Sequence, residues 1–340
     1  MSLSTSTKYH EIEDTGVRNV ESSRPDAYLH DSLTPHFLQG SQRSVQSQER
    51  LAKGATAHEA ALGGGHVTTW IAVRGHLVDK QITTSMNDLC FSSPHMYNEH
   101  VNPAADHTVQ QQVVLLGAGL DTRAWRLAFP PGVAWYEVDQ ASVLDFKISR
   151  LQKAGAGMQA GLTSKAFPLK SASYTAVAAD LSDADWTSAL RKSGWQEHLP
   201  TTWVAEGLLY YMEPADVAAL LNKIAAMSAV ESFLIATAVT TAYIDYGRQV
   251  AATMESGLLP TLMAAMKWTL PSDALSHFQK CNWQIQRSVD LLQQAREMGV
   301  RLQPFADEPD SLDECEAAIG YKVMVCSTET MSSVKKVIQA

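Results

Sequence analysis

A chain of 340 residues with 45% hydrophobic residues can bury a substantial core, which excludes intrinsic disorder as the general state of the protein. The formal net charge of −9 argues against a nucleic-acid partner, because proteins that hold phosphates gather Lys and Arg into patches. No apolar run reaches the 18 residues that a membrane-spanning helix needs, so we expect no membrane partner. Residues 1–14 lack both the apolar core of a secretory signal and the acid-poor composition of a transit peptide, and we therefore expect a cytoplasmic protein.

The four cysteines stand at positions 90, 281, 315 and 326. They form no CxxC pair and no Cys/His pattern with the spacing of a zinc site. This pattern predicts structural thiols in a reducing compartment and no metal site.

The first part of the chain, residues 1–110, is predicted to be an N-terminal helical cap and lid region. Apolar residues at Leu33, Phe37 and Leu38 recur at helical spacing, and a second helix is predicted from Val67 to Leu89. Residues 39–65 between them are polar and end in three glycines, which is typical of a mobile lid and equally of a plain insertion.

From residue 111 to about 330 the pattern changes to short apolar runs separated by helical segments. Runs that lack strict alternation suit strands buried on both faces of a parallel sheet. The predicted strands are Val113–Leu116, Val133–Tyr136, Thr175–Ala178, Trp203–Ala205, Phe233–Ala236, and a terminal pair, Trp283–Val289 and Tyr321–Ser327. We predict an α/β fold with a Rossmann-like, doubly wound, seven-stranded sheet that is mostly parallel with an antiparallel last strand, integrated with the N-terminal helical region.

A glycine turn follows the first predicted strand. Gly117-Ala118-Gly119 leads into a helix, and glycines at such a turn let a ligand approach the backbone close to unpaired helical N–H groups. The third glycine of the dinucleotide fingerprint is absent, because Thr122 stands at its position. A purely structural turn between strand and helix is the alternative.

Acidic residues follow the next three strands. Asp139 ends the second strand, about twenty residues on, where a carboxylate can accept hydrogen bonds from both ribose hydroxyls; Glu137 is held in reserve. After the third strand, Asp180 can accept from an adenine amino group while Leu181 covers the ring, although Asp180 could instead cap the following helix. After the fourth strand, Glu206 is placed to hold a cationic amine.

A glycine turn, a ribose acid, an adenine acid and an amine acid thus follow one another on strands one to four. This array fits an adenosyl ligand that carries an amino-acid end. It fits a dinucleotide poorly, since two phosphates would lie beside several carboxylates.

These motifs resemble those of the leucine carboxyl methyltransferase family of class I methyltransferases. The resemblance rests on the stretches 116–123, 136–140, 179–181 and 206–211, with Arg74 on an upstream helix and a looser match at 18–22. It covers residues 15–38 and 67–235 and implies S-adenosyl-L-methionine as cofactor. The implied roles are Arg74 for the cofactor carboxylate, Gly117 for its methionine part, Asp139 for the ribose, Asp180 and Leu181 for the adenine, and Glu206 for the amino end, with Gly119 in the same turn.

The predicted function is therefore methyl transfer from S-adenosyl-L-methionine, with O-methylation of a hydroxyl or carboxyl group of a small molecule preferred. A protein C-terminal carboxyl methyltransferase, an NAD(P)-dependent oxidoreductase and a non-catalytic cofactor-binding protein are the alternatives. A carboxylate acceptor needs no general base, whereas a hydroxyl acceptor gains from one. No residue is favoured for that role by spacing; Tyr211 and His66 are weak candidates, beside Tyr210, His95 and His100. The insertion at 39–65 leaves the acceptor pocket undefined.

Overall fold

The computed structural model describes residues 15, 18, 19, 22, 27, 29–38, 67–92, 111–159, 166–253, 258–299 and 320–328. Within these residues the helices are α2 (Thr34–Leu38), α4 (Val67–Ser92), α5 (Arg123–Arg126), α6 (Ala141–Lys153), α7 (Trp186–Lys192), the 3-10 helix η2 (Leu209–Tyr211), α8 (Pro214–Ala226), α9 (Thr241–Ala252), α10 (Leu258–Ala265), α11 (Ala274–Lys280) and α12 (Leu291–Glu297). The strands are β1 (Gln111–Leu116), β2 (Val133–Asp139), β3 (Ser173–Ala178), β4 (Thr201–Ala205), β5 (Phe233–Val239), β6 (Trp283–Asp290) and β7 (Tyr321–Thr328).

The strands form one seven-stranded sheet in the order β3-β2-β1-β4-β5-β7-β6. The first five strands are parallel to one another, and β7 runs antiparallel to both β5 and β6. The predicted fold class is confirmed, including the antiparallel last strand. The strand order reverses between β1 and β4, and ligands of open α/β sheets bind beyond the carboxyl ends of the strands at such a switch point.

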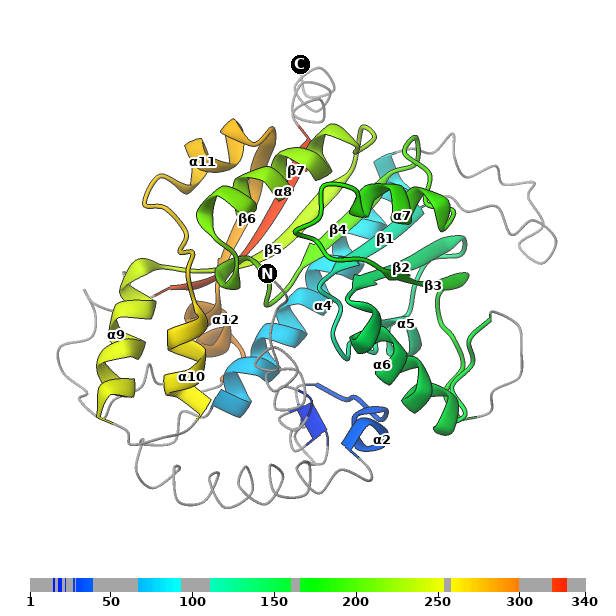
Figure 1. Cartoon of the computed structure of the whole chain (residues 1–340), viewed down its shortest axis with the longest axis horizontal. Coiled ribbons are helices and arrows are strands. Elements are labelled where there is room, and N and C mark those ends of the chain that lie inside the picture. The colour runs from blue at the N-terminus through cyan, green and yellow to red at the C-terminus, as the bar shows by residue number, and fades with distance from the viewer. Residues whose placement is uncertain are drawn as a thin grey trace.

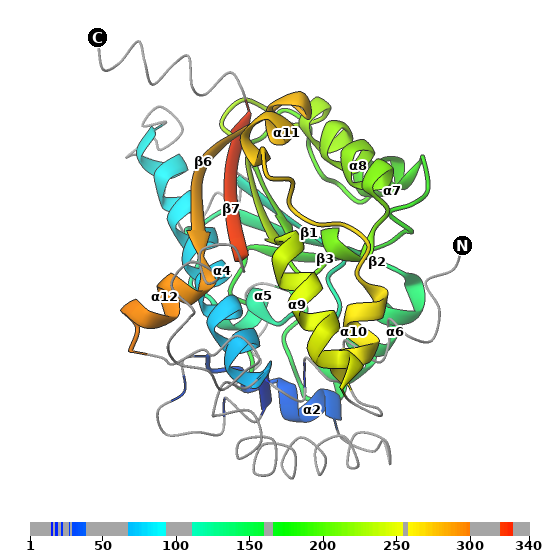
Figure 2. The same ribbon diagram turned by 90° about the vertical axis from the view of Figure 1, so that its left-hand side faces the viewer.

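Helices cover both faces of this sheet, which explains why the inner strands are continuous apolar runs. Every residue of β1 is buried, and its side chains alternate between two cores. Val113 and Leu115 pack on the face that α4 and α12 cover, whereas Val114 and Leu116 pack on the face of α7, α8 and α11. Figures 1 and 2 show these two helical layers on opposite sides of the sheet.

The terminal pair of strands is rearranged relative to the chain order. β7, the last strand, lies between β5 and β6, so β6 forms one edge of the sheet and β3 the other. The register of β6 shifts between Ile285 and Arg287, and Arg287 is exposed there. A bulge and a charged side chain are common protections of an edge strand against pairing with another chain.

Of the N-terminal region, the structure describes α2, α4 and a few residues between positions 15 and 33. The predicted helix at Val67–Leu89 is confirmed as α4, which packs against β4, β5 and β7. Residues 39–65 lie outside the described residues, as do His66, His95 and His100. Within the described part of the chain, no helix is long and apolar enough to cross a membrane.

Candidate functional site

The glycine turn after β1 adopts the backbone conformation that its sequence predicts. Gly117 and Gly119 have φ values of +66° and +48°, in the left-handed region that favours glycine. The amides of Gly117 and Ala118 both donate to the Val138 carbonyl oxygen of β2, at 2.9 and 3.3 Å. A Cβ atom at position 117 would lie 3.1 Å from a methyl carbon of Leu208, so a larger residue there would be crowded as well as conformationally strained.

Replacing Gly117 by alanine should therefore lower the free energy of unfolding by about 2–3 kcal/mol, from the left-handed conformation and the crowding at Leu208 together. Gly155→Ala is a matched control, because Gly155 has a φ of +74° but no atom within 4 Å of the added Cβ. The control should lose only about 1 kcal/mol. Urea denaturation of both variants measures the difference. Equal losses of the free energy of unfolding would show that the contact between the added Cβ atom and Leu208 costs nothing.

Asp139 at the end of β2 is oriented by the backbone. Its Oδ2 accepts from the Gly119 amide at 2.7 Å, and its Oδ1 accepts from the Gln140 amide at 2.6 Å. Burial raises the pKa of Asp139, and these two amide hydrogen bonds oppose that rise. A carboxylate has about four acceptor positions, so each oxygen can still accept one bond from a ligand hydroxyl.

Glu137, the reserve candidate, is engaged in the protein interior. It lies two residues before Asp139 and therefore on the same face of β2. Its side chain is fully buried in an ion pair with Lys147 of α6, and it also accepts from Tyr174 Oη at 2.8 Å and from Trp135 Nε1 at 3.2 Å. The preference for Asp139 thus agrees with the geometry, because Glu137 has no exposed surface to offer a ligand.

Asp180 and Leu181 follow β3 and are both half-buried. Oδ1 of Asp180 accepts from the amide and the hydroxyl of Ser182, at 2.9 and 2.7 Å, and these bonds orient the carboxylate. The alternative role of Asp180 as a helix cap does not hold, since α7 begins at Trp186 with Asp185 at its N-cap.

Glu206, directly after β4, lies between two arginines. Its Oε1 is 2.7 Å from Arg74 Nε, and its Oε2 is 2.7 Å from Arg123 Nη2. The structure thus brings together Arg74 and Glu206, which are 132 residues apart. Burial favours the neutral acid, but the positive charges of Arg123 and then Arg74 outweigh it and lower the pKa of Glu206 to about 2.

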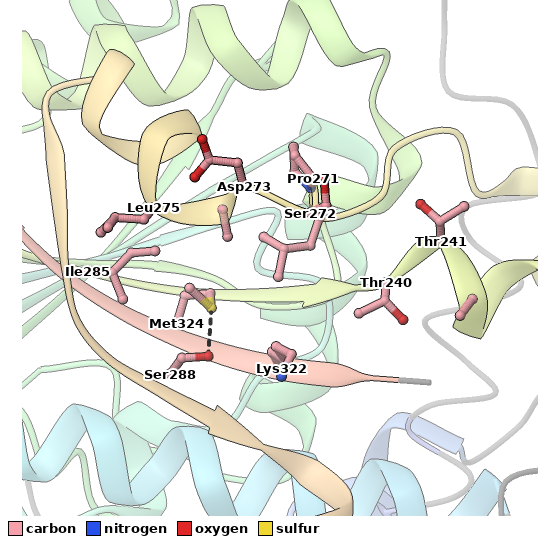
Figure 3. Close-up of a pocket in the computed structure, with 13 residues that line it drawn as sticks. Thr240, Thr241, Pro271, Ser272, Asp273, Leu275, Ile285, Ser288, Lys322 and Met324 are labelled. Carbon is pink, nitrogen blue, oxygen red and sulfur yellow. Dashed lines mark hydrogen bonds between the residues drawn. The ribbon is translucent and has the colours of Figure 1, made fainter. Parts of the chain in front are cut away.

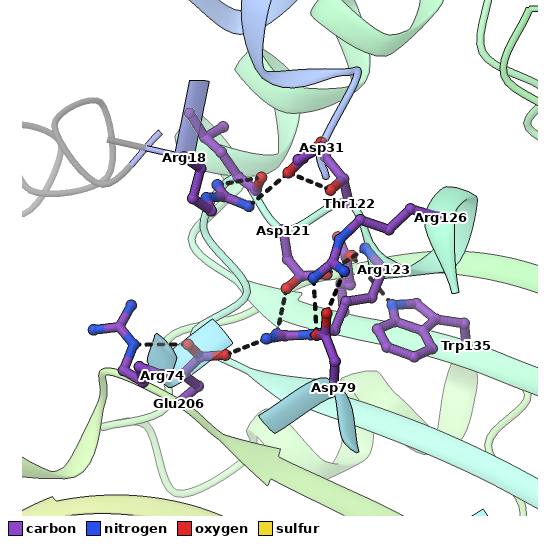
Figure 4. Close-up of polar contacts among 12 residues, drawn as sticks. Arg18, Asp31, Arg74, Asp79, Asp121, Thr122, Arg123, Arg126, Trp135 and Glu206 are labelled. Atoms are coloured by element: carbon purple, nitrogen blue, oxygen red, sulfur yellow. Dashed lines mark hydrogen bonds and ion pairs between the residues drawn. The ribbon is translucent and has the colours of Figure 1, made fainter. Parts of the chain in front are cut away.

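Arg123 links this pair to two further carboxylates. Its Nε is 2.6 Å from Asp79 Oδ1 of α4, and its Nη1 is 2.6 Å from Asp121 Oδ2 of the glycine turn. The guanidinium, 3% exposed, thus contacts three acids from three segments (Figure 4). We call these four residues, together with Arg74, the Arg123 cluster. Arg126 pairs with Asp79 from outside the cluster.

No role was predicted from the sequence for Arg123, Asp79 or Asp121. The sequence held part of this information, because the opposite charges Asp121 and Arg123 stand between an apolar strand with its glycine turn and the apolar residues Ala124 and Trp125. Buried charges are normally paired, so such a stretch predicts a buried ion pair.

Thr122, at the position of the missing third glycine, connects the glycine turn to the N-terminal segment. Its Oγ1 donates to Asp31 Oδ2 at 2.6 Å. Arg18 donates to the same carboxylate oxygen at 3.1 Å and to the Leu120 carbonyl oxygen at 2.9 Å. The hydroxyl of Thr122 thus has a structural use that glycine could not supply.

The tyrosines after β4 differ in their surroundings. Tyr210 is buried, and its hydroxyl lies 2.9 Å from that of Tyr321. Burial raises the pKa of Tyr210 well above its ordinary value, which makes it unfit as a general base at neutral pH. Tyr211 is half-buried with its ring centroid 4.7 Å from that of Tyr210, so of the two it remains the accessible candidate.

A pocket of about 560 Å³ lies on the opposite face of the sheet from α4. Figure 3 shows it between the loop that leads into α11 and the strands β5, β6 and β7. Lys322 and Met324 of β7 line it, whereas Tyr321, one residue earlier on β7, packs against Trp70 of α4. None of the predicted cofactor residues lines this pocket, so it is separate from the Arg123 cluster.

The described residues contain no group of three or more His, Cys, Asp and Glu side chains that could hold a metal ion. Cys281 and Cys326 are buried free thiols. Burial raises the pKa of both, so neither has the thiolate character of a reactive cysteine.

Comparison with known proteins identifies relatives that match part of this chain. A protein of Mycobacteroides abscessus, assigned by its name to the S-adenosyl-L-methionine-dependent methyltransferases, is 34% identical over 220 residues, which are 65% of this chain and 62% of that protein. A protein of Mycobacterium tuberculosis with the same assignment is 43% identical over 136 residues, which are 40% of this chain and 39% of that protein. The chain thus spans less than two thirds of the length of either relative. The crystal structure of a DUF574 family protein from Streptomyces avermitilis is 10% identical, with a TM-score of 0.48 over 92% of this chain and 96% of that one.

The sequence profile described as leucine carboxyl methyltransferase matches residues 12–225. This range contains the glycine turn, all three strand-end acids and the Arg123 cluster. It covers more than half of the chain and confirms the resemblance that the motifs predicted. This chain belongs to the leucine carboxyl methyltransferase family.

Proposed function

We propose that this protein is an S-adenosyl-L-methionine-dependent methyltransferase that methylates a hydroxyl or carboxyl group of a small molecule. Family membership and the names of the relatives support methyl transfer. The proposal depends most on one observation, the pairing of Arg74 with Glu206 beside the glycine turn. A cation and an anion held side by side match the carboxylate and ammonium groups of an amino acid.

The residues present fit this cofactor along its length. Arg74 would bind the carboxylate of the methionine part and Glu206 its ammonium group. The turn at Gly117, where a Cβ atom would be crowded, allows close approach of a ligand to the backbone. Asp139 would accept from the ribose hydroxyls through the acceptor positions that its two amide bonds leave.

Asp180 and Leu181 would hold the adenine. Both hydrogen bonds from Ser182 end on Oδ1 of Asp180, which leaves Oδ2 to accept from an adenine amino group. Leu181, half-buried next to it, would cover one face of the ring. When bound, the cofactor supplies an electrophilic methyl group on a sulfonium.

The chain's part in catalysis would be mainly to position an acceptor against this methyl group, because positioning contributes most of the rate of a displacement reaction. A carboxylate acceptor needs no base. For a hydroxyl acceptor, Tyr211 is the candidate among the described residues, and His66 lies outside them.

Two alternatives use the same site in other ways. A protein C-terminal carboxyl methyltransferase would bind the same cofactor but take a chain terminus as acceptor. An NAD(P)-dependent oxidoreductase would have to place two phosphates near Asp180 and Glu206, which like-charge repulsion disfavours, and Thr122 replaces the third glycine that its fingerprint uses.

Calorimetric titration tests the cofactor directly. S-adenosylmethionine and S-adenosylhomocysteine should bind the wild-type protein with micromolar affinity, and NADH should not bind. Glu206→Gln should weaken the binding of both adenosyl ligands by about 10- to 100-fold, because a charged hydrogen bond to the ammonium group contributes about 1.5–3 kcal/mol. Glu213→Gln is the control, since that side chain is 58% exposed and should not affect binding. Binding of NADH alone would overturn the proposal. With the cofactor established, transfer of a labelled methyl group to hydroxyl, carboxyl and peptide acceptors separates the remaining alternatives.

A further inference from the structure

The Glu206 carboxylate has two oxygens with different partners. Oε1 faces Arg74 and Oε2 faces Arg123. Arg74 reaches Glu206 through Nε, and its terminal nitrogens point away from that carboxylate (Figure 4). Arg74 would therefore divide its guanidinium between Glu206 and the cofactor carboxylate, whereas the Arg123 guanidinium contacts three carboxylates of the protein.

Arg123 is built to stay in place. Its guanidinium is nearly fully buried and contacts Asp79 and Asp121 as well as Glu206, at 2.6–2.7 Å. Its own backbone amide donates to Asp121 Oδ1 at 2.7 Å, which fixes the start of α5 against the turn. Three carboxylates from α4, the glycine turn and the end of β4 thus hold one planar cation, in the geometry for which arginine is suited.

We propose, on the basis of the proposed function, that Arg123 is a positioning residue for cofactor binding: it holds Glu206 ionised and oriented through Oε2 and thereby leaves Oε1 for the cofactor ammonium. Arg123 would itself touch no part of the cofactor. Its effect on binding would pass through the charge state of Glu206, which a merely structural arginine would not influence.

The charged groups that face Glu206 come from two elements, Arg74 of α4 and Arg123 of α5, while Asp79 and Asp121 share the Arg123 guanidinium. Both arginines oppose the effect of burial on the pKa of Glu206. Removing Arg123 leaves a buried carboxyl with one cationic neighbour, and desolvation then shifts its pKa upward. A protonated Glu206 cannot pair with an ammonium group, so binding should weaken as the pH falls.

The test compares the affinity for S-adenosylhomocysteine at pH 8 and pH 6 in the full-length protein. In Arg123→Met we expect the ratio of the affinity at pH 8 to that at pH 6 to exceed the wild-type ratio by about twofold or more, because a higher pKa of Glu206 lowers its ionised fraction at the lower pH. Comparison with the wild-type ratio cancels any titration of the ligand.

Arg126→Met is the matched control. It removes an arginine from the same short helix, and that arginine pairs with Asp79 without touching Glu206. Its affinity ratio should equal that of the wild type. The double variant Arg123→Met/Glu206→Gln lacks the Glu206 carboxyl that titrates. It should bind S-adenosylhomocysteine weakly, and its ratio of the affinities at pH 8 and pH 6 should equal that of the wild type.

If Arg123→Met does not fold, as circular dichroism would show, Arg123→Lys replaces it. A lysine keeps the charge but cannot contact three carboxylates in the guanidinium geometry, so a smaller shift of the same sign is expected. A wild-type ratio in a folded Arg123 variant would overturn the proposal. Absence of binding by the wild-type protein at either pH would instead overturn the proposed function, so the two failures are distinguishable.

Discussion

Replacing Asp139 by alanine is expected to weaken the binding of S-adenosylhomocysteine by at least about 100-fold, the largest effect on binding that we predict. The proposed contact is a pair of hydrogen bonds from ribose hydroxyls to a carboxylate, and each charged hydrogen bond contributes about 1.5–3 kcal/mol. The carboxylate is already oriented by the amides of Gly119 and Gln140, so little conformational freedom remains to be lost on binding. Calorimetric titration of the variant measures the effect.

Adenosine as a second ligand shows which part of the cofactor Asp139 holds. Adenosine has the ribose but no ammonium group, so Asp139→Ala should abolish its binding while Glu206→Gln should leave it unchanged. Asp145→Ala is the control, because Asp145 is an exposed acid on α6 six residues further on. If Asp139→Ala bound both ligands as the wild type does, the carboxylate would not be the ribose acceptor.

Replacing Lys147 by methionine is expected to lower the free energy of unfolding by about 3–5 kcal/mol, the largest effect on stability that we predict. Lys147 and Glu137 are both fully buried, and removal of the lysine leaves an uncompensated carboxylate in the core. Lys153→Met on the same helix replaces an exposed lysine and should change stability by less than about 0.5 kcal/mol. Urea denaturation of both variants measures the difference.

The pH dependence of this loss follows from the pKa of Glu137. Burial already raises that pKa despite Lys147, and loss of the lysine raises it further. A folded state with the higher pKa binds more protons than the unfolded state, so stability falls as pH rises from the unfolded value of about 4.3 through the folded one. The deficit of Lys147→Met should thus be larger at pH 7.5 than at pH 5.5. A second change, Glu137→Gln, should recover part of the stability and remove the pH dependence; a deficit that persists unchanged would contradict the assignment of the pair.

The sheet was predictable because its strands are encoded locally. A parallel strand covered by helices on both faces is a short, continuous apolar run, as in Val113–Leu116 and Phe233–Ala236. The glycine turn was predictable for a similar reason, since Gly117 and Gly119 adopt conformations that other residues rarely take. The position of β7 between β5 and β6 could not be assigned from the apolar runs alone, because pairing depends on contacts between distant strands.

Asp139 was preferred to Glu137 from the sequence because it ends the strand, but the surroundings of the two acids are visible only in the tertiary structure. Both acids lie on one face of β2, and their sequence neighbourhoods are alike. The docking of α6 brings Lys147 to Glu137 and buries it, while Asp139 at the strand end meets the glycine turn. Glu137 lies beneath a packed helix and is fully buried, whereas Asp139 lies at the strand end. Of the two carboxylates, Asp139 is therefore the one placed to contact a ligand.

The order of the strands and helices along the chain, the glycine turn and the acids at the strand ends could all be predicted from the amino-acid sequence. Each of these depends on the identity and periodicity of neighbouring residues. Which charges pair depends on the three-dimensional fold, because Arg123 contacts Asp79 from 44 residues away and Arg74 contacts Glu206 from 132 residues away. An ion pair forms where the fold brings two oppositely charged side chains within a few ångströms. That distance cannot be predicted from the number of residues that separate them along the chain.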